Sequence, residues 1–317
     1  MQRDFGAAKT TFSRVSKMLP GNSEVRGALG RVTRREGYWD QSIAYYDQAL
    51  ILDPRNVELL FNAAATYAEL RQFPAALKLY DRVLDITPNE PEALADKAGI
   101  YQAQGNLPQA ADLLREVNAQ SSSDLAFGTK LTQLRLERSY GDAVQFLQAR
   151  LAQFHYTSED DQGRAQTALA HAQRFAGDTA GAQVSAEQAR NTLEQLKDQS
   201  NDDLLLALHA EDLSRAYAVM GKKDPALKEA ERAIMLVPRA KDAVDGPGAE
   251  ENLALIQTIF GENSRAISTL SQLLETPYSS SLYAATPITP ALLRLDPLWD
   301  PLRPDPAFQK LCEEKQP

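Results

Sequence analysis

The feature that most constrains the fold is an internal repeat with a period of 34 residues. Segments 37–54, 71–88 and 105–117 align without gaps at this offset. The alignment places Tyr46 on Tyr80 and Pro54 on Pro88. A period of this length is typical of stacked supersecondary units, each of which buries its apolar face against its neighbours. The repeat therefore takes precedence over the two domains that a length of 317 residues alone would suggest.

Each unit is predicted to be a pair of amphipathic helices. In residues 57–88, apolar side chains recur at helical spacing in two stretches separated by a short break: Leu60, Ala63, Ala64 and Tyr67, and then Ala76, Leu77, Tyr80 and Val83. Glycines such as Gly37 and Gly105 stand in the breaks, where a helix commonly ends on a left-handed residue. Prolines such as Pro88 end the second helices, because proline cannot continue the hydrogen-bond ladder.

These residues resemble the tetratricopeptide repeat family, whose unit is a 34-residue helix-turn-helix. Four weaker units continue the register at 138–151, 176–189, 220–238 and 260–274. The resemblance implies an all-α fold, a right-handed α-α superhelix of about fifteen helices with a short helical C-terminal cap. We expect four parts: the second helix of a truncated repeat (1–22), three regular units (23–122), four degenerate units (123–278) and the cap (279–317). Because residues 1–22 supply only a second helix, we also expect a longer parent protein.

The C-terminal segment differs in kind from the repeats. Four pairs place a capping side chain before a proline, which is typical of short helices or turns: Thr289-Pro290, Asp296-Pro297, Asp300-Pro301 and Asp305-Pro306. We expect Trp299, Leu302 and Phe308 to cover the apolar face of the last repeat. Residues 293–311 also resemble the ends of tetratricopeptide regions in large bacterial signalling proteins of the Ser/Thr kinase, nucleotide cyclase or winged-helix types.

The composition narrows the classes of partner. Lys and Arg total 34 against 43 Asp and Glu, a net charge of −9, which disfavours a general nucleic-acid or anionic-membrane binder. The one cysteine, Cys312, cannot form an intrachain disulfide. The N-terminal residues carry charges and lack the apolar core of a signal peptide. We therefore expect a cytoplasmic protein without membrane insertion, and a membrane-anchored longer parent stays an open alternative.

Motifs for catalysis are missing from the sequence. It contains no phosphate-binding loop, dinucleotide fingerprint, zincin motif, nucleophile elbow or paired-cysteine spacing. The Asp4-Phe5-Gly6 triplet matches the magnesium-binding triplet of protein kinases, but no other kinase motif accompanies it, so Phe5 is interpreted as a repeat-core aromatic. The three histidines lie in separate units without metal-ligand spacing. We predict no catalytic residue, no metal site and no cofactor.

The remaining candidate site is a surface. In the family that the repeats resemble, the first helices of successive units line a concave groove. In this register the groove positions carry Arg31, Arg34, Arg35, Asn62, Arg135, His171, Arg174 and Arg215. An ordinary solvated helix face is the alternative interpretation of these residues. We predict a non-catalytic protein-interaction scaffold that binds a protein or peptide segment, with an acidic segment as the favoured partner. The alternative is the regulatory C-terminal tetratricopeptide region of a bacterial Ser/Thr protein kinase or a related signalling protein.

Overall fold

The computed structural model describes residues 4–156, 158–197, 199–283 and 286–313. Over these residues the chain forms seventeen α-helices, one 3-10 helix and no strand, which confirms the predicted all-α superhelix. The parts predicted at 1–22 and 279–317 include residues 1–3, 284–285 and 314–317, which lie outside the described residues. Among the described residues there are three more helices than the fifteen or so expected, because short helices begin at Pro290, Pro297 and Pro306 of the C-terminal segment, whereas Pro301 lies inside the second of them.

The first seven helices follow the 34-residue register. They are α1 (Phe5–Met18), α2 (Ser23–Arg35), α3 (Trp39–Leu52), α4 (Val57–Glu69), α5 (Phe73–Ile86), α6 (Pro91–Ala103) and α7 (Leu107–Leu113). Asn22 and Asn56 cap α2 and α4, each accepting a hydrogen bond from a backbone N–H of the first turn. Ala76 is fully buried in α5, as a small residue must be where two helices pack closely.

The next eight helices range in length from 12 residues in α15 to 18 in α11. They are α8 (Asp124–Leu136), α9 (Tyr140–Gln153), α10 (Glu159–Phe175), α11 (Thr179–Leu196), α12 (Asp203–Val219), α13 (Lys223–Leu236), α14 (Gly246–Ile259) and α15 (Asn263–Leu274). The turns inside the helix pairs contain glycines with positive φ: Gly37, Gly105, Gly177, Gly221 and Gly261. Two turns place an arginine at the same point, Arg71 at φ 58° and Arg138 at φ 59°.

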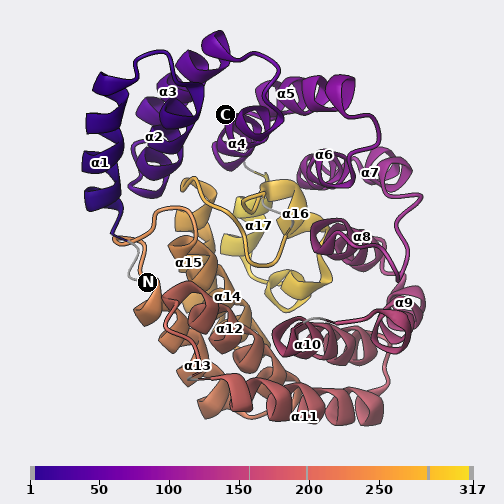
Figure 1. The fold of residues 1–317 in the computed structure, drawn as a ribbon. Coiled ribbons are helices and arrows are strands. Elements are labelled where there is room, and N and C mark those ends of the chain that lie inside the picture. The colour runs from indigo at the N-terminus through magenta and orange to yellow at the C-terminus, as the bar shows by residue number, and fades with distance from the viewer. Residues whose placement is uncertain (1–3, 157, 198, 284–285, 314–317) are drawn as a thin grey trace.

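The helices are arranged as a ring, and its two ends touch (Figure 1). The contact joins the end of α2 to the link between α13 and α14. Arg35 forms ion pairs with Asp242 and, at 2.6 Å, with Asp245. The backbone N–H of Ala243 donates to the carbonyl of Arg35 at 2.8 Å. Residues more than 200 positions apart in the sequence thus meet, which an open stack of repeats would not allow.

The C-terminal segment fills the centre of this ring (Figure 1). It contains α16 (Pro290–Leu295), the 3-10 helix η1 (Pro297–Leu302) and α17 (Pro306–Glu313). We call residues 275–313 the tail. Thr289 Oγ1 caps α16 and donates to the carbonyl of Ala103 on α6 at 2.6 Å. The tail therefore contacts early repeats as well as the last one, which is a larger role than the predicted cap.

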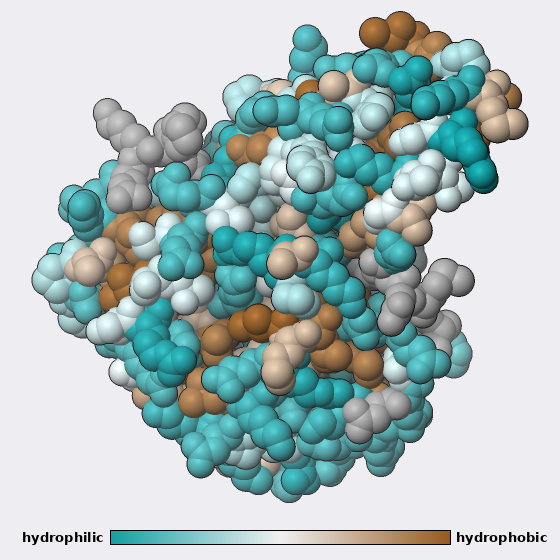
Figure 2. Space-filling model, turned by 90° about the vertical axis from the view of Figure 1, so that its left-hand side faces the viewer, coloured by the Kyte–Doolittle hydropathy of each residue, from teal (hydrophilic) through white to brown (hydrophobic). Residues whose placement is uncertain are grey.

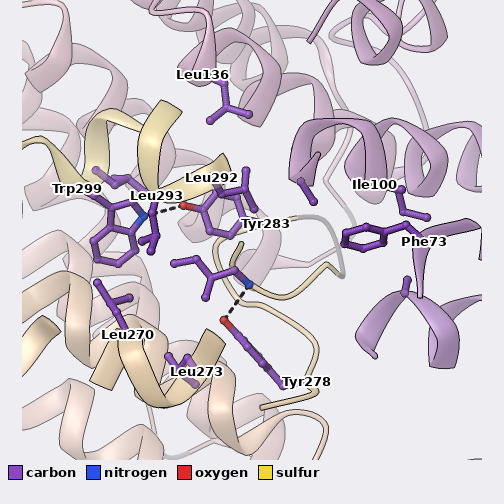
Figure 3. Packing of buried hydrophobic residues seen from close by; sticks show 14 of the residues in the cluster. Phe73, Ile100, Leu136, Leu270, Leu273, Tyr278, Tyr283, Leu292, Leu293 and Trp299 are labelled. Carbon is purple, nitrogen blue, oxygen red and sulfur yellow. Dashed lines mark hydrogen bonds between the residues drawn. The ribbon is translucent and has the colours of Figure 1, made fainter. Parts of the chain in front are cut away.

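The tail contributes to one large apolar cluster (Figure 3). Trp299, Leu302 and Phe308 share this cluster with Leu270 and Leu273 of α15, the face that they were expected to cover. Side chains of α5, α6 and α8 also join it, so the tail bridges both sides of the ring. Burying a large apolar side chain contributes roughly 1.5–3 kcal/mol, so the tail is an integral part of the core.

Polar atoms within the cluster find partners in the tail and on α14. The indole Nε1 of Trp299 donates to the hydroxyl of Tyr283 at 2.8 Å. The hydroxyl of Tyr278 accepts from the backbone N–H of Ile288 at 3.1 Å and donates to Glu251 at 3.0 Å. Both tyrosines and Trp299 are buried, so each lost partner would leave an unsatisfied polar atom in the core.

The two left-handed arginines hold the tail. Arg71 donates to three backbone carbonyls, those of Leu273 and Thr276 at 2.8 Å and that of Ile288 at 3.0 Å. Arg138 binds Asp300 through both Nη atoms, at 2.7 and 2.8 Å. A non-glycine residue in this backbone region costs about 1 kcal/mol or more. The tail contacts of Arg71 offset that cost.

Replacing Arg71 with Ala is expected to lower the free energy of unfolding by about 2–4 kcal/mol, because three carbonyls lose a charged donor. The free energy of unfolding of Arg71→Gly is expected to decrease by about 1 kcal/mol less than that of Arg71→Ala, since glycine adopts a positive φ without strain. Chemical unfolding of the purified variants measures both values.

The matched control is Arg138→Gly. Its side chain is 47% exposed, and exposed ion pairs contribute little, so relief of strain should leave stability unchanged or slightly raised. Equal losses at Arg71 and Arg138 would contradict the assigned role of Arg71.

Candidate functional site

A cavity of about 280 Å³ lies inside the ring, where α8 and α10 face each other. Residues of α9, α12 and α14 and of the tail complete its walls. We call this space the inner cavity. It lies on the surface that the family resemblance assigned to partner binding, in a part that the tail borders but does not fill.

The inner cavity exists because two neighbouring units are spaced apart. The link between α9 and α10 includes part of a Ser- and Asp-rich segment at 155–163. The walls are largely apolar, with Leu131 of α8 and Leu147 of α9 on one side and the tail residues Leu282 and Leu298 on the other. An apolar cavity with a few polar groups is the usual form of a binding site for a small group.

Four arginines reach the cavity, and each faces an aspartate. Arg150 Nη2 lies 2.8 Å from Asp124 Oδ1. Arg135 Nε lies 3.1 Å from Asp296 Oδ2, a carboxylate of the tail. Arg215 Nη2 lies 2.7 Å from Asp212 Oδ1. Arg164 is held more loosely, since its carboxylate contacts are longer, at 3.5 Å to Asp161 Oδ1 and 3.6 Å to Asp212 Oδ2, and its side chain is 46% exposed. Arg164 is thus the cation of this site that can most easily turn toward a ligand.

His171 of α10 also lines the cavity. Burial lowers the pKa of His171 to about 3, and the charges of Arg215, Arg174 and Arg135 act in the same direction. The imidazole is therefore neutral at physiological pH. Its Nε2 atom is inaccessible to solvent and has no hydrogen-bond partner among the described residues. An unpaired polar atom at a cavity wall is a feature that a bound group can satisfy.

The structure separates the predicted site residues into two groups. Arg31, Arg34, Arg35 and Asn62 lie on α2 and α4, close to the ring closure. Arg31 pairs with Glu58 at 2.7 Å. Arg34 is buried beside Glu69, and Arg35 forms the ring closure described above. The side chain of Asn62 donates to the backbone of its own helix. These four side chains are engaged with the chain itself.

The second group surrounds the inner cavity. Arg135, His171 and Arg215 line it, and Arg174 donates to the carbonyl of Ala218 at 3.1 Å. All three arginines lie near enough to His171 to affect its pKa. The register of the repeats therefore brings together residues from three different units.

Sequence reasoning missed the other contributors. Arg164 lies seven residues before His171 on α10, two helical turns away on the same face, and this spacing could have identified it. Arg71 stands where other units have glycine, a signal present in the aligned repeats. Asp296 was interpreted as a helix cap. It does cap η1 through Leu298 N, and it binds Arg135 as well.

Two buried carboxyl groups lie next to the tail. Burial raises the pKa of Glu211 and that of Glu251 to about 7. The Glu251 carboxyl accepts hydrogen bonds from Tyr278 and, at 2.5 Å, from Ser280. These bonds favour the charged form, whereas the nearby Glu211 and the loss of solvent oppose it.

The outer surface is a less well-defined candidate binding site than the inner cavity. Figure 2 shows the face that carries α1, α13 and α15, where hydrophilic residues predominate and an apolar band crosses the lower half. Met18 on α1 and Met235 on α13 are exposed large apolar side chains. An enclosed space with converging polar groups is a better-defined candidate site than an open surface band.

Two further tests bear on the chemistry of the chain. Within the described residues, no cluster of three or more histidine, cysteine or acidic side chains is arranged to hold a metal ion. The described helices include none that combines the length and apolar character needed to cross a bilayer. The geometry of the inner cavity supports binding, through apolar contact and charged hydrogen bonds.

Comparison with known sequences addresses the repeats directly. Models of the tetratricopeptide repeat match residues 2–57, 28–91 and 68–134. Together these matches cover residues 2–134 of the 317. Such repeats indicate a scaffold for protein-protein interaction. No curated protein matches the chain by sequence.

A solved structure extends the likeness in fold beyond these residues. A tetratricopeptide repeat protein from Parabacteroides merdae ATCC 43184 has a TM-score of 0.54 and 18% identity, covering 80% of this chain and 93% of that one. At that identity the likeness concerns the fold alone. The Cut9-Hcn1 hetero-tetramer of the APC/C has a TM-score of 0.49 and 12% identity over 74% of this chain. The chain spans 44% of that protein's length.

Glu251→Gln tests the buried carboxyl group. A pKa raised from 4.5 to about 7 contributes stability that is present below the unfolded value and is lost as the pH rises through 7. The free energy of unfolding of the wild type should therefore decrease between pH 5 and 8. In the variant this decrease should be smaller by roughly 1–3 kcal/mol. Chemical unfolding at a series of pH values measures this slope.

The neighbouring Glu250→Gln is the matched control. Glu250 binds Arg239 and is only half-buried, so this variant should keep the wild-type slope. A wild-type slope in Glu251→Gln would show that this carboxyl group does not titrate as described.

Proposed function

We propose that the chain is a non-catalytic protein-interaction scaffold that binds an acidic segment of a partner protein at the inner cavity. The tetratricopeptide repeats support the scaffold. The observation that carries the location is the tail, which fills the centre of the ring and leaves the space between α8 and α10 open. A partner segment therefore has room at this part of the inner surface.

The engaged side chains of the first group support this choice. Arg34 and Arg35 already bind carboxylates of the chain, and Arg35 also maintains the ring closure. A ligand that recruited them would remove an arginine from the buried carboxylates of Glu69 and Asp242, which costs several kcal/mol. Binding of an acidic segment to the arginines of α2 would therefore destabilise the fold.

The electrostatics of the second group support an acidic partner. Arg135, Arg174 and Arg215 each disfavour a positive charge on His171, so the potential at this wall is positive. Carboxylates are attracted to such a surface, and the attraction is strongest where solvent is partly excluded. The lining of the inner cavity holds four arginines and three aspartates, so within a chain of net charge −9 it carries a small excess of positive charge.

A second proposal concerns the larger protein. The resemblance of residues 293–311 to the tails of bacterial signalling proteins favours a regulatory C-terminal region of a Ser/Thr protein kinase or a related protein. Trp299 and Leu302 of this segment are fully buried, so in this chain the apolar residues of the segment pack in the core. A kinase, cyclase or winged-helix domain encoded upstream in the same reading frame would support this proposal, and a complete frame without one would overturn it.

A peptide-display selection against the full chain tests the proposed function. Selected peptides should be enriched in Asp and Glu, and their affinity should fall as the salt concentration rises. Arg164→Glu should weaken their binding at least about tenfold, because it places a negative charge at the cavity.

Arg31→Glu is the matched control. Arg31 is a similarly exposed groove arginine of the first group, and its replacement should leave peptide affinity unchanged. Binding that is lost in Arg31→Glu and kept in Arg164→Glu would overturn the proposed location.

A further inference from the structure

We infer that the inner cavity is an anchor pocket for one compact apolar side chain of the partner, aromatic or branched aliphatic, with a carboxylate next to it at Arg164. This inference rests on the proposed function and specifies the chemistry of the partner segment. It is carried by the size of the cavity, the character of its walls and the position of its charged groups.

The size of the cavity matches a single side chain. Its volume is about 280 Å³. An apolar cavity of about 150 Å³ in a protein core is large enough to bind benzene. The inner cavity therefore has room for a phenyl ring or a branched aliphatic group, and it is too small for a folded element such as a helix, whose diameter with side chains is about 10–12 Å.

The walls favour an apolar occupant. Phe127, Leu131 and Leu147 come from the repeats, and Leu282 and Leu298 come from the tail. A side chain that enters removes its own apolar surface and that of these walls from water, which is the main source of affinity at such sites. Because the tail supplies one wall, the pocket is a property of this chain and not of the repeat unit.

The charged side chains at the mouth of the cavity favour an anionic group of the ligand over a cationic one. Arg135 is paired with Asp296, and Arg215 is paired with Asp212. Their positive charges therefore raise the electrostatic potential in the cavity, but their N–H groups are already used as hydrogen-bond donors. Arg164 is loosely held and partly exposed, so its guanidinium can bind a carboxylate at the mouth. A ligand ammonium would instead face four arginines and a neutral His171, and the three aspartates of the lining are already paired with arginines. An apolar acid therefore fits the site better than an apolar amine.

Gly128 provides a way to close the cavity. It lines the cavity on α8, and a Cβ atom added there would meet no atom within 4 Å. A leucine at this position should therefore extend into the cavity without displacing the helix backbone. Gly141 on α9 also has open space at its Cβ and is exposed, so Gly141→Leu is a matched substitution outside the cavity.

Three probes with the same phenyl group test the inference: 3-phenylpropionate, 3-phenylpropionamide and 3-phenylpropylamine. Binding to the full chain is measured by ligand-observed NMR and calorimetry. The acid should bind at least threefold more tightly than the amide, and the amine more weakly than both. Gly128→Leu should abolish binding of the acid, and Gly141→Leu should preserve it. Arg164→Gln should reduce the difference between acid and amide.

The outcomes separate this inference from the proposed function. Absence of saturable binding by the acid, equal or tighter binding of the amine, or unchanged binding in Gly128→Leu would overturn the anchor pocket. The display selection decides the proposed function separately. Acidic peptides that lose affinity in Arg164→Glu but not in Gly128→Leu would uphold the proposed function and overturn the anchor pocket. Peptides that lose affinity in both variants would support both.

Discussion

The structure depends on the burial of its own C-terminal tail at the centre of the ring. Repeat stacks are held mainly by contacts between neighbouring units, so their ends are free to move apart. Here Trp299 and its neighbours contact helices on opposite sides of the ring, and Arg71 and Arg138 attach the tail to two turns. The apolar cluster thus adds long-range contacts to a chain whose sequence pattern is local.

This arrangement also decides where a partner has room to bind. In an open superhelix the whole concave surface is available, but here the tail occupies much of it. The first group of arginines is used for packing and ring closure, whereas the second group surrounds a cavity. The same residue type therefore has a structural role at Arg35 and, in our proposal, a binding role at Arg164.

Much of the fold could be predicted from the sequence, because a helix pair depends on residues within one unit. The register placed Ala76 and Tyr80 in the core, and it brought Arg135, His171 and Arg215 to one surface. The position of the tail could not be predicted in this way. It depends on the curvature accumulated over all units, and the contact of Arg71 with Ile288 spans 217 positions. The cavity could not be predicted from the sequence either, since its size depends on the spacing of α8 and α10 rather than on any one residue.

Hydrogen exchange of the full chain tests most directly whether the tail is a fixed part of the fold. The backbone amides of Ile288, Leu293 and Asp296 donate to buried or helical acceptors within the tail. The account predicts that they exchange as slowly as the amides of α14, because they open only when the core opens. Exchange as fast as that of the exposed link around Gln120 would contradict it, since the tail would then leave the ring while the repeats stay folded.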